Sequence, residues 1–110
     1  MVDLPKLASW GANVQEGLSR CVNNEAFYLR LVQKGLGGED LDALEEALKE
    51  HDLDRAFGLA HKLKGVYANL ALTPMLTPIA ELTELLRNKI PGDYMGLLNQ
   101  AKSKRTELLD

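Results

Sequence analysis

The sequence predicts an all-α fold, an antiparallel four-helix bundle with short extra N-terminal helices. Apolar residues recur at three- and four-residue spacings through most of the chain, which is the period of an amphipathic helix. Aromatic residues make up only 5% of the chain, and few segments alternate apolar with polar side chains, so a sheet protein is disfavoured. Glycine and proline separate the periodic segments by short connections, and helices joined in this way pack most simply as antiparallel neighbours.

The chain is expected to begin with two short helical pieces that cover one end of the bundle. The first spans about residues 3–9 and ends before Gly11. The second spans about 14–21, where Asn13 can cap it because an asparagine side chain accepts a hydrogen bond from a free N–H of the first turn.

Longer segments of helical period follow. Three of them span about residues 25–34, 39–50 and 53–70. A fourth, rich in leucine, follows and continues through residue 86, and a last one spans about 94–108. Asn23 or Asn24, Asp52 and Asp93 stand where N-caps are needed. The glycine-rich stretch 35–38 ends the first of these helices.

Two prolines complicate the leucine-rich helix. Thr73-Pro74 should interrupt the helical pattern, since the residue before a proline is pushed out of the helical region. Pro78 then lies either in the first turn of the next helix, where proline is tolerated, or just inside it as a kink.

Composition limits the possible functions. The 110 residues predict one domain, 1–110, with one core. A net charge of −3, from 13 basic and 16 acidic residues, lacks the basic excess that nucleic-acid binding requires. The single cysteine, Cys21, is expected to be a small buried residue in a reducing compartment. No apolar run approaches the length of a membrane span, and the first residues do not read as a secretory signal, so we expect a cytoplasmic domain without direct membrane contact. We expect a monomer, because the helices can bury their apolar faces within one chain.

One residue of the helix 53–70 is not explained by packing. At 100° per residue, the apolar side chains of this helix gather on one broad face, and His61 points away from the middle of that face. The stripe that contains His61 also holds Asp54, Gly58, Gly65 and Ala68. A glycine inside a helix costs roughly 1 kcal/mol relative to alanine, so two of them on an exposed stripe indicate that another protein approaches the histidine closely.

The chemistry that this stripe permits is phosphoryl transfer. An exposed neutral imidazole is a nucleophile at physiological pH. Lys64, one turn further along, can offset charge on phosphoryl oxygens, and the glycines can admit a donor. The same pattern also fits a surface histidine that happens to lie beside a lysine, and on this stripe alone that interpretation is at least as well supported.

The segment around the histidine resembles a known family. Ala60-His61-Lys62-Leu63-Lys64-Gly65 is similar to the Ala-His-x-Leu-Lys-Gly signature of histidine-containing phosphotransfer domains in two-component phosphorelays. Upstream, Gly17-Leu18-Ser19-Arg20 and Asn24-Glu25-Ala26-Phe27-Tyr28-Leu29 also resemble that family. The resemblance implies a four-helix bundle that functions in signal transduction as a phosphoprotein carrying phosphohistidine.

The resemblance also implies roles for particular residues. His61 would be the phosphoacceptor, Lys64 its charge partner, and Gly65 the residue that gives access to the ring. Further residues expected to contact a partner are Phe57, Gly58, Lys62, Ala68 and Leu72. The partners would be receiver domains of response regulators and hybrid histidine kinases. The domain would need no cofactor and no ATP site of its own, because any magnesium ion would belong to the receiver.

The sequence departs from the family pattern in places. Val66 and Tyr67 follow the signature glycine where small residues are usual, and Ala71 stands where a glycine is frequent. A leucine-glutamate pair common in the next helix is replaced by Leu82-Thr83, with Glu84 one place later. Val66 and Tyr67 are expected to point toward the core and to affect the chemistry little, whereas the other departures concern the geometry of the helix that faces His61.

Two other classes of function were weighed. A helical adaptor could bind receivers or other signalling partners without carrying phosphate, but such degenerate domains lack the histidine or its lysine. A metal-binding bundle would need several ligands at helical spacing, and the two histidines, His51 and His61, are ten residues apart without a matching Glu-x-x-His pattern, so no metal is expected.

Overall fold

The computed structural model describes residues 2–110, which form seven helices and no strand. They are α1 (Leu4–Trp10), α2 (Val14–Arg20), α3 (Glu25–Gly35), α4 (Glu39–Lys49), α5 (Leu53–Asn69), α6 (Thr73–Arg87) and α7 (Tyr94–Leu109). The predicted all-α class is confirmed, and apart from α6 each helix begins and ends within one residue of its expected bounds. Within the described range, no helix combines the length and the apolar character that crossing a bilayer requires.

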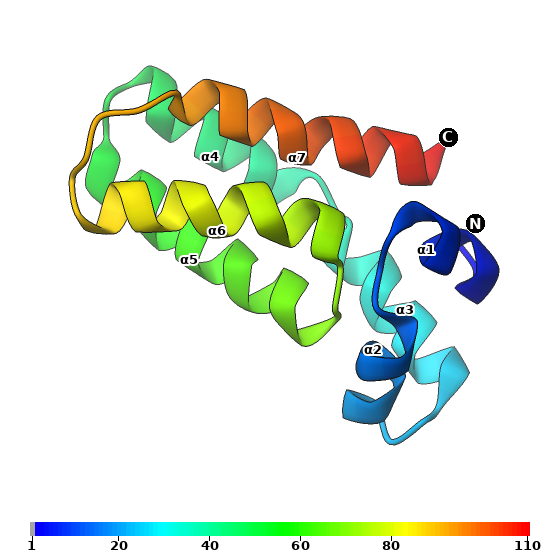
Figure 1. Ribbon diagram of the computed structural model, residues 1–110. Helices are drawn as coiled ribbons and strands as arrows, with labels where there is room; N and C mark the ends of the chain where they lie inside the picture. Colours follow the sequence, from blue (N-terminus) through cyan, green and yellow to red (C-terminus); the bar gives the residue numbers. More distant parts are fainter. Residues whose placement is uncertain (1) are drawn as a thin grey trace.

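The four C-terminal helices form the bundle (Figure 1). Successive helices from α4 to α7 run in opposite directions, and α5 packs against both α4 and α6. The last helix, α7, closes the bundle against α6 and α4. The three N-terminal helices lie beyond one end of this bundle, and α1 contacts α7 near the C-terminus. The bundle therefore leaves one side of α5 facing away from its neighbours.

Helix N-caps are formed by the side chains that the sequence indicates. Asn13, Asn24, Asp52 and Asp93 each accept a hydrogen bond from the backbone N–H three residues further along. These bonds satisfy donors that have no partner inside the helix. Of the two candidates for the α3 cap, it is Asn24 that caps. The cap by Asp52 fixes where α5 begins, and thereby the rotational position of every residue that follows on that helix.

The prolines interrupt the chain less than expected. Thr73 is already helical, as the first residue of α6, and Pro74 occupies the second position, where no N–H is needed for a helical hydrogen bond. The expectation that Thr73 lies outside the helix was therefore wrong, because the break falls before it, at the turn that follows α5. Pro78 lies inside α6 and is buried, which decides between the two placements considered for it.

The turn between α5 and α6 is where the N-terminal helices attach. Ala71 has a φ of 56°, in the left-handed region, and the N–H of Asn13 donates to its carbonyl at 3.0 Å. The hydroxyl of Tyr28 donates to the carbonyl of Leu70 at 2.9 Å, and the Arg20 guanidinium donates to the carbonyl of Ala68. These contacts cover the C-terminal end of α5 and leave its middle uncovered.

One continuous core joins the two parts of the molecule. Its members include leucines from every helix of the bundle and Leu7, Tyr28 and Val32 from the N-terminal helices. Cys21 is free and buried within it, as expected for a small apolar residue. Tyr67 is fully buried on α5, and burial raises the pKa of its hydroxyl. Helices from both parts of the described chain, residues 2–110, thus contribute to one hydrophobic core.

Candidate functional site

The α5 helix has one buried face and one exposed face. Ala56, Ala60, Leu63 and Tyr67 are buried at the three- and four-residue spacings of an amphipathic helix. His61 is exposed. The prediction that His61 lies off the core face is confirmed, because Asp52 starts the helix in the register that the apolar pattern requires.

Two glycines flank His61 on the exposed face. Gly58 and Gly65 are both exposed, and a Cβ added to either would meet no atom within 4 Å. Neither glycine is therefore required by packing inside this molecule. Ala68, one further turn along, continues this line of small residues and is half-buried. Together, Gly58, His61, Gly65 and Ala68 form what we call the His61 stripe.

An ion-pair network from α6 lies on one side of the His61 stripe. The Lys64 ammonium lies 3.6 Å from Oε1 of Glu84, and Nε of Arg87 lies 3.4 Å from the same oxygen. Lys64 is one turn after His61 on α5, while Glu84 and Arg87 are one turn apart on α6. The neighbouring helix therefore brings one carboxylate and a second cation to the edge of the site.

Phe57 connects this network to the histidine. Its ring centroid lies 5.7 Å from that of His61, with the two planes tilted by 40°. The Arg87 guanidinium carbon lies 5.0 Å from the Phe57 centroid, a distance typical of a cation–π contact. Phe57 is half-buried, so one part of the ring packs while another borders the imidazole.

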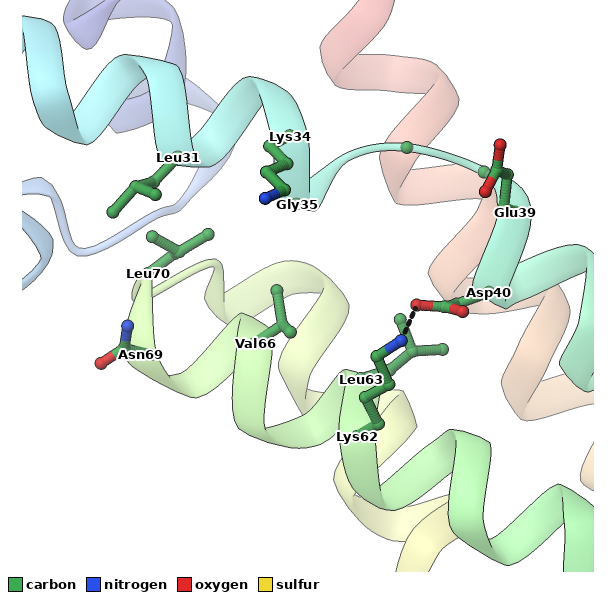
Figure 2. A pocket seen from close by; sticks show the side chains of 12 residues that line it. Leu31, Lys34, Gly35, Glu39, Asp40, Lys62, Leu63, Val66, Asn69 and Leu70 are labelled. Atoms are coloured by element: carbon green, nitrogen blue, oxygen red, sulfur yellow. Dashed lines mark ion pairs between the residues drawn. The ribbon is translucent and has the colours of Figure 1, made fainter.

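A groove lies on the other side of the stripe (Figure 2). Its volume is about 660 Å³, and α3, the start of α4 and α5 line it. Leu31, Val66 and Leu70 supply apolar walls near one end. At the other end, Nζ of Lys62 pairs with Oδ2 of Asp40 at 3.1 Å. Lys62, expected at a partner surface, thus lies exposed at the rim of this groove.

The imidazole of His61 forms no hydrogen bond with any of residues 2–110. Thr83, in the place where the family commonly has glutamate, is buried, and its hydroxyl donates to the Ile79 carbonyl of its own helix at 2.7 Å. Glu84, one residue later, is exposed and pairs with Lys64 instead. A shift of one residue moves the carboxylate by about 100° around α6, and that rotation decides which side chain of α5 it reaches.

The predicted surface position of one contact residue is wrong. Leu72 was expected at the margin of the docking surface, but it is completely buried, in the turn between α5 and α6. Because α5 ends at Asn69, the helical period that would place Leu72 near the His61 stripe no longer applies there. Leu72 belongs to the core and is removed from the surface.

Sequence reasoning did not identify the side chains that other helices contribute. Glu84 was noted only as a displaced glutamate, and Arg87 and Asp40 were not singled out. The carboxylates of Glu84 and Asp40 are opposite in charge to Lys64 and Lys62, but opposite charge does not say which helices are neighbours. As for metals, residues 2–110 contain no group of three or more His, Cys, Asp or Glu side chains arranged to hold an ion.

Comparison with known families agrees with this geometry. The model of the Hpt domain matches residues 36–107, which is more than half of the chain and covers the α4–α7 bundle except for the last two residues of α7. This chain belongs to the Hpt domain family, and an Hpt domain is a phosphocarrier of phosphorelay signalling. The match begins at residue 36, so the upstream stretches that also resemble the family lie outside it. No match was found among curated proteins or among solved structures.

Proposed function

We propose that His61 accepts a phosphoryl group from the aspartyl phosphate of a receiver domain and passes it reversibly to another receiver. The observation that carries this proposal is an exposed imidazole between Gly58 and Gly65, two glycines that no internal contact requires. Each costs roughly 1 kcal/mol of helix stability relative to alanine. Both glycines are explained if a partner protein needs close access to the His61 ring.

The transfer step needs little from this chain besides a nucleophile and a cation. The lone pair of the unprotonated ring nitrogen of His61 attacks phosphorus in line with the bond to the aspartate oxygen. That bond breaks as the N–P bond forms, and the aspartate leaves as a carboxylate. The reverse sequence returns the group to a receiver. Both phosphorylated forms are reactive, so the direction follows from the partners' concentrations and affinities.

The residues around His61 have separable roles in this proposal. Lys64 offsets the negative charge of the phosphoryl oxygens, and Gly65 keeps the approach to the ring open. Phe57, Gly58, Lys62 and Ala68 form the surface on which a receiver docks. Receivers of response regulators and hybrid kinases are the partners, and magnesium enters with them.

The compartment, the oligomeric state and the source of the phosphoryl group are also part of this proposal. We place the reaction in the cytoplasm, where a free buried thiol such as Cys21 stays reduced. A monomer is expected, since the helices bury their apolar faces within one chain. The phosphoryl group comes from another protein, so the domain needs no nucleotide site.

The test is transfer from a phosphorylated receiver. Wild-type protein should acquire label that is labile in acid and stable in alkali, as phosphohistidine is, and His61→Gln should acquire none. His51→Gln is the matched control, because it removes the other exposed histidine and should label like the wild type. Label on His61→Gln would contradict the assignment.

The same experiment tests the adaptor alternative. An adaptor would bind receivers through the same surface without acquiring label. Wild-type protein that binds several phosphorylated receivers and takes label from none would favour that function over phosphotransfer.

A further inference from the structure

The ion pairs between α5 and α6 point to a regulatory role for a residue outside the family signature. We propose that Glu84, which pairs with the cations Lys64 and Arg87 at the edge of the site, competes for them with the phosphoryl group on His61. This inference rests on the proposed function, because it concerns how strongly the phosphorylated state of His61 is favoured.

The geometry shows a single carboxylate oxygen shared by two cations. Oε1 of Glu84 lies 3.6 Å from the Lys64 ammonium and 3.4 Å from Nε of Arg87. Half of the Glu84 side chain, 51%, is exposed, so water screens both contacts. Contacts of this kind exchange readily, and a stronger anion nearby can replace the carboxylate.

Lys64 is connected to His61 along α5, and Arg87 is connected to it through Phe57. Lys64 follows His61 by one helical turn, so the two side chains emerge on neighbouring parts of α5. Arg87 lies over Phe57, whose ring in turn lies 5.7 Å from the imidazole. Phe57 therefore links Arg87 to the His61 ring by a contact that does not depend on Glu84.

Phosphorylation changes the charge balance of this cluster. Without phosphate, Glu84 offsets part of the positive charge of Lys64 and Arg87. A phosphoryl group on His61 brings close to two negative charges, which attract the same cations and repel the carboxylate. Each cation that turns to the phosphoryl group gives up a contact with Glu84. The carboxylate thus lowers the net gain from phosphorylation and keeps the group transferable.

Removing the carboxylate should therefore favour phosphohistidine. Glu84→Gln retains the size of the side chain and removes its charge. In the equilibrium between this domain and a receiver, the ratio of phosphorylated domain to phosphorylated receiver should rise about two- to fivefold, the size of the effect of an exposed ion pair. The half-life of the phosphohistidine in the isolated domain should also lengthen, because the cations stabilise the phosphorylated state more strongly.

Glu81 provides a matched control on the same helix. It is exposed and lies one turn before Glu84, and the carboxylate that pairs with Lys64 and Arg87 is that of Glu84, not of Glu81. Glu81→Gln makes the same change of charge without removing a partner of Lys64 or Arg87. It should leave the equilibrium near the wild-type ratio, because an exposed carboxylate that pairs with neither cation is screened by water and salt.

A double variant tests whether the effect passes through the lysine. In a Lys64→Ala background, Glu84→Gln should shift the equilibrium less than in the wild type. A shift of full size in that background would overturn the proposed competition for Lys64. Circular dichroism of each variant checks that the helices are retained. If they are, a changed equilibrium ratio reports the change of charge and not a loss of folding.

The outcomes distinguish this inference from the function on which it rests. Wild-type protein that takes label, together with an unchanged ratio for Glu84→Gln, overturns the role of Glu84 alone. An equal shift for Glu81→Gln also overturns it, since general charge would then account for the effect. Wild-type protein that takes no label from any receiver contradicts the proposed phosphotransfer, and the role of Glu84 with it.

Discussion

Glycine serves two different purposes in this molecule, one on the N-terminal helices and one on the His61 stripe. Gly17 on α2 lies against the ring of Tyr28, so that an added Cβ would come within 2.6 Å of Cζ and 2.7 Å of the hydroxyl oxygen. At Gly35, at the end of α3, an added Cβ would lie 2.9 Å from Cδ1 of Leu70. For Gly58 and Gly65 on α5, an added Cβ would meet no neighbour within 4 Å.

The difference separates the needs of folding from those of binding. Gly17 lets Tyr28 approach α2 closely while the tyrosine hydroxyl bonds to the Leu70 carbonyl, so this glycine helps to attach the N-terminal helices to the bundle. Gly58 and Gly65 lower the stability of α5, and no internal contact offsets the loss. A partner that must come close to His61 supplies the missing reason.

The strongest test of this comparison is a long side chain beside the histidine. Gly65→Gln should slow phosphoryl transfer by on the order of 10²-fold, because a small displacement of the donor from in-line geometry has an effect of that size. The free energy of unfolding should rise by up to about 1 kcal/mol, since glutamine favours the helix more than glycine does. Single-turnover transfer from a labelled receiver and urea denaturation measure the two quantities. Transfer at the wild-type rate would show that the docking surface lies elsewhere.

A smaller effect is expected from a methyl group at the packed glycine. Gly17→Ala should lower the free energy of unfolding by about 1–3 kcal/mol, the usual range for overpacking a well-packed site. Tyr28 would have to move, and its bond to the Leu70 carbonyl would weaken. Ser19→Ala, at an exposed position of the same helix, is the control and should remain near wild type in urea denaturation. Equal stability of the two variants would remove the distinction between the two kinds of glycine.

The smallest expected change is a gain. Gly58→Ala should raise the free energy of unfolding by roughly 1 kcal/mol, because alanine stabilises a helix interior and the space beside Gly58 is open. Thermal denaturation followed by circular dichroism would measure it. A loss of stability would mean that Gly58 has a packing role after all, and the stripe could then no longer be attributed to a partner.

Local interactions explain which parts of the fold could be predicted. Side chains of Asn13, Asn24, Asp52 and Asp93 cap helices through bonds to N–H groups three residues away, so nearby sequence is sufficient to place those helix starts. The period of apolar residues then orients each helix toward the core. The exposed position of His61 follows from these two local facts.

Contacts between helices could not be predicted in the same way. Thr73 was expected outside α6, and Ala71 instead takes the left-handed conformation that turns the chain. Ala71 also accepts the hydrogen bond from Asn13, a residue far away in the sequence. When a turn is stabilised by a distant segment, the residues next to it in the sequence give little indication of where it lies.

The sequence by itself determined an all-helical chain, the residues that cap its helices, and a histidine placed off the core face with a lysine one turn away. These features depend on spacing along a helix, which is fixed at 3.6 residues per turn. The tertiary structure alone decided that Leu72 is buried and that Glu84, rather than Thr83, reaches Lys64. Those outcomes depend on how α5 and α6 are rotated against each other, and that rotation is set by the packing of the whole core.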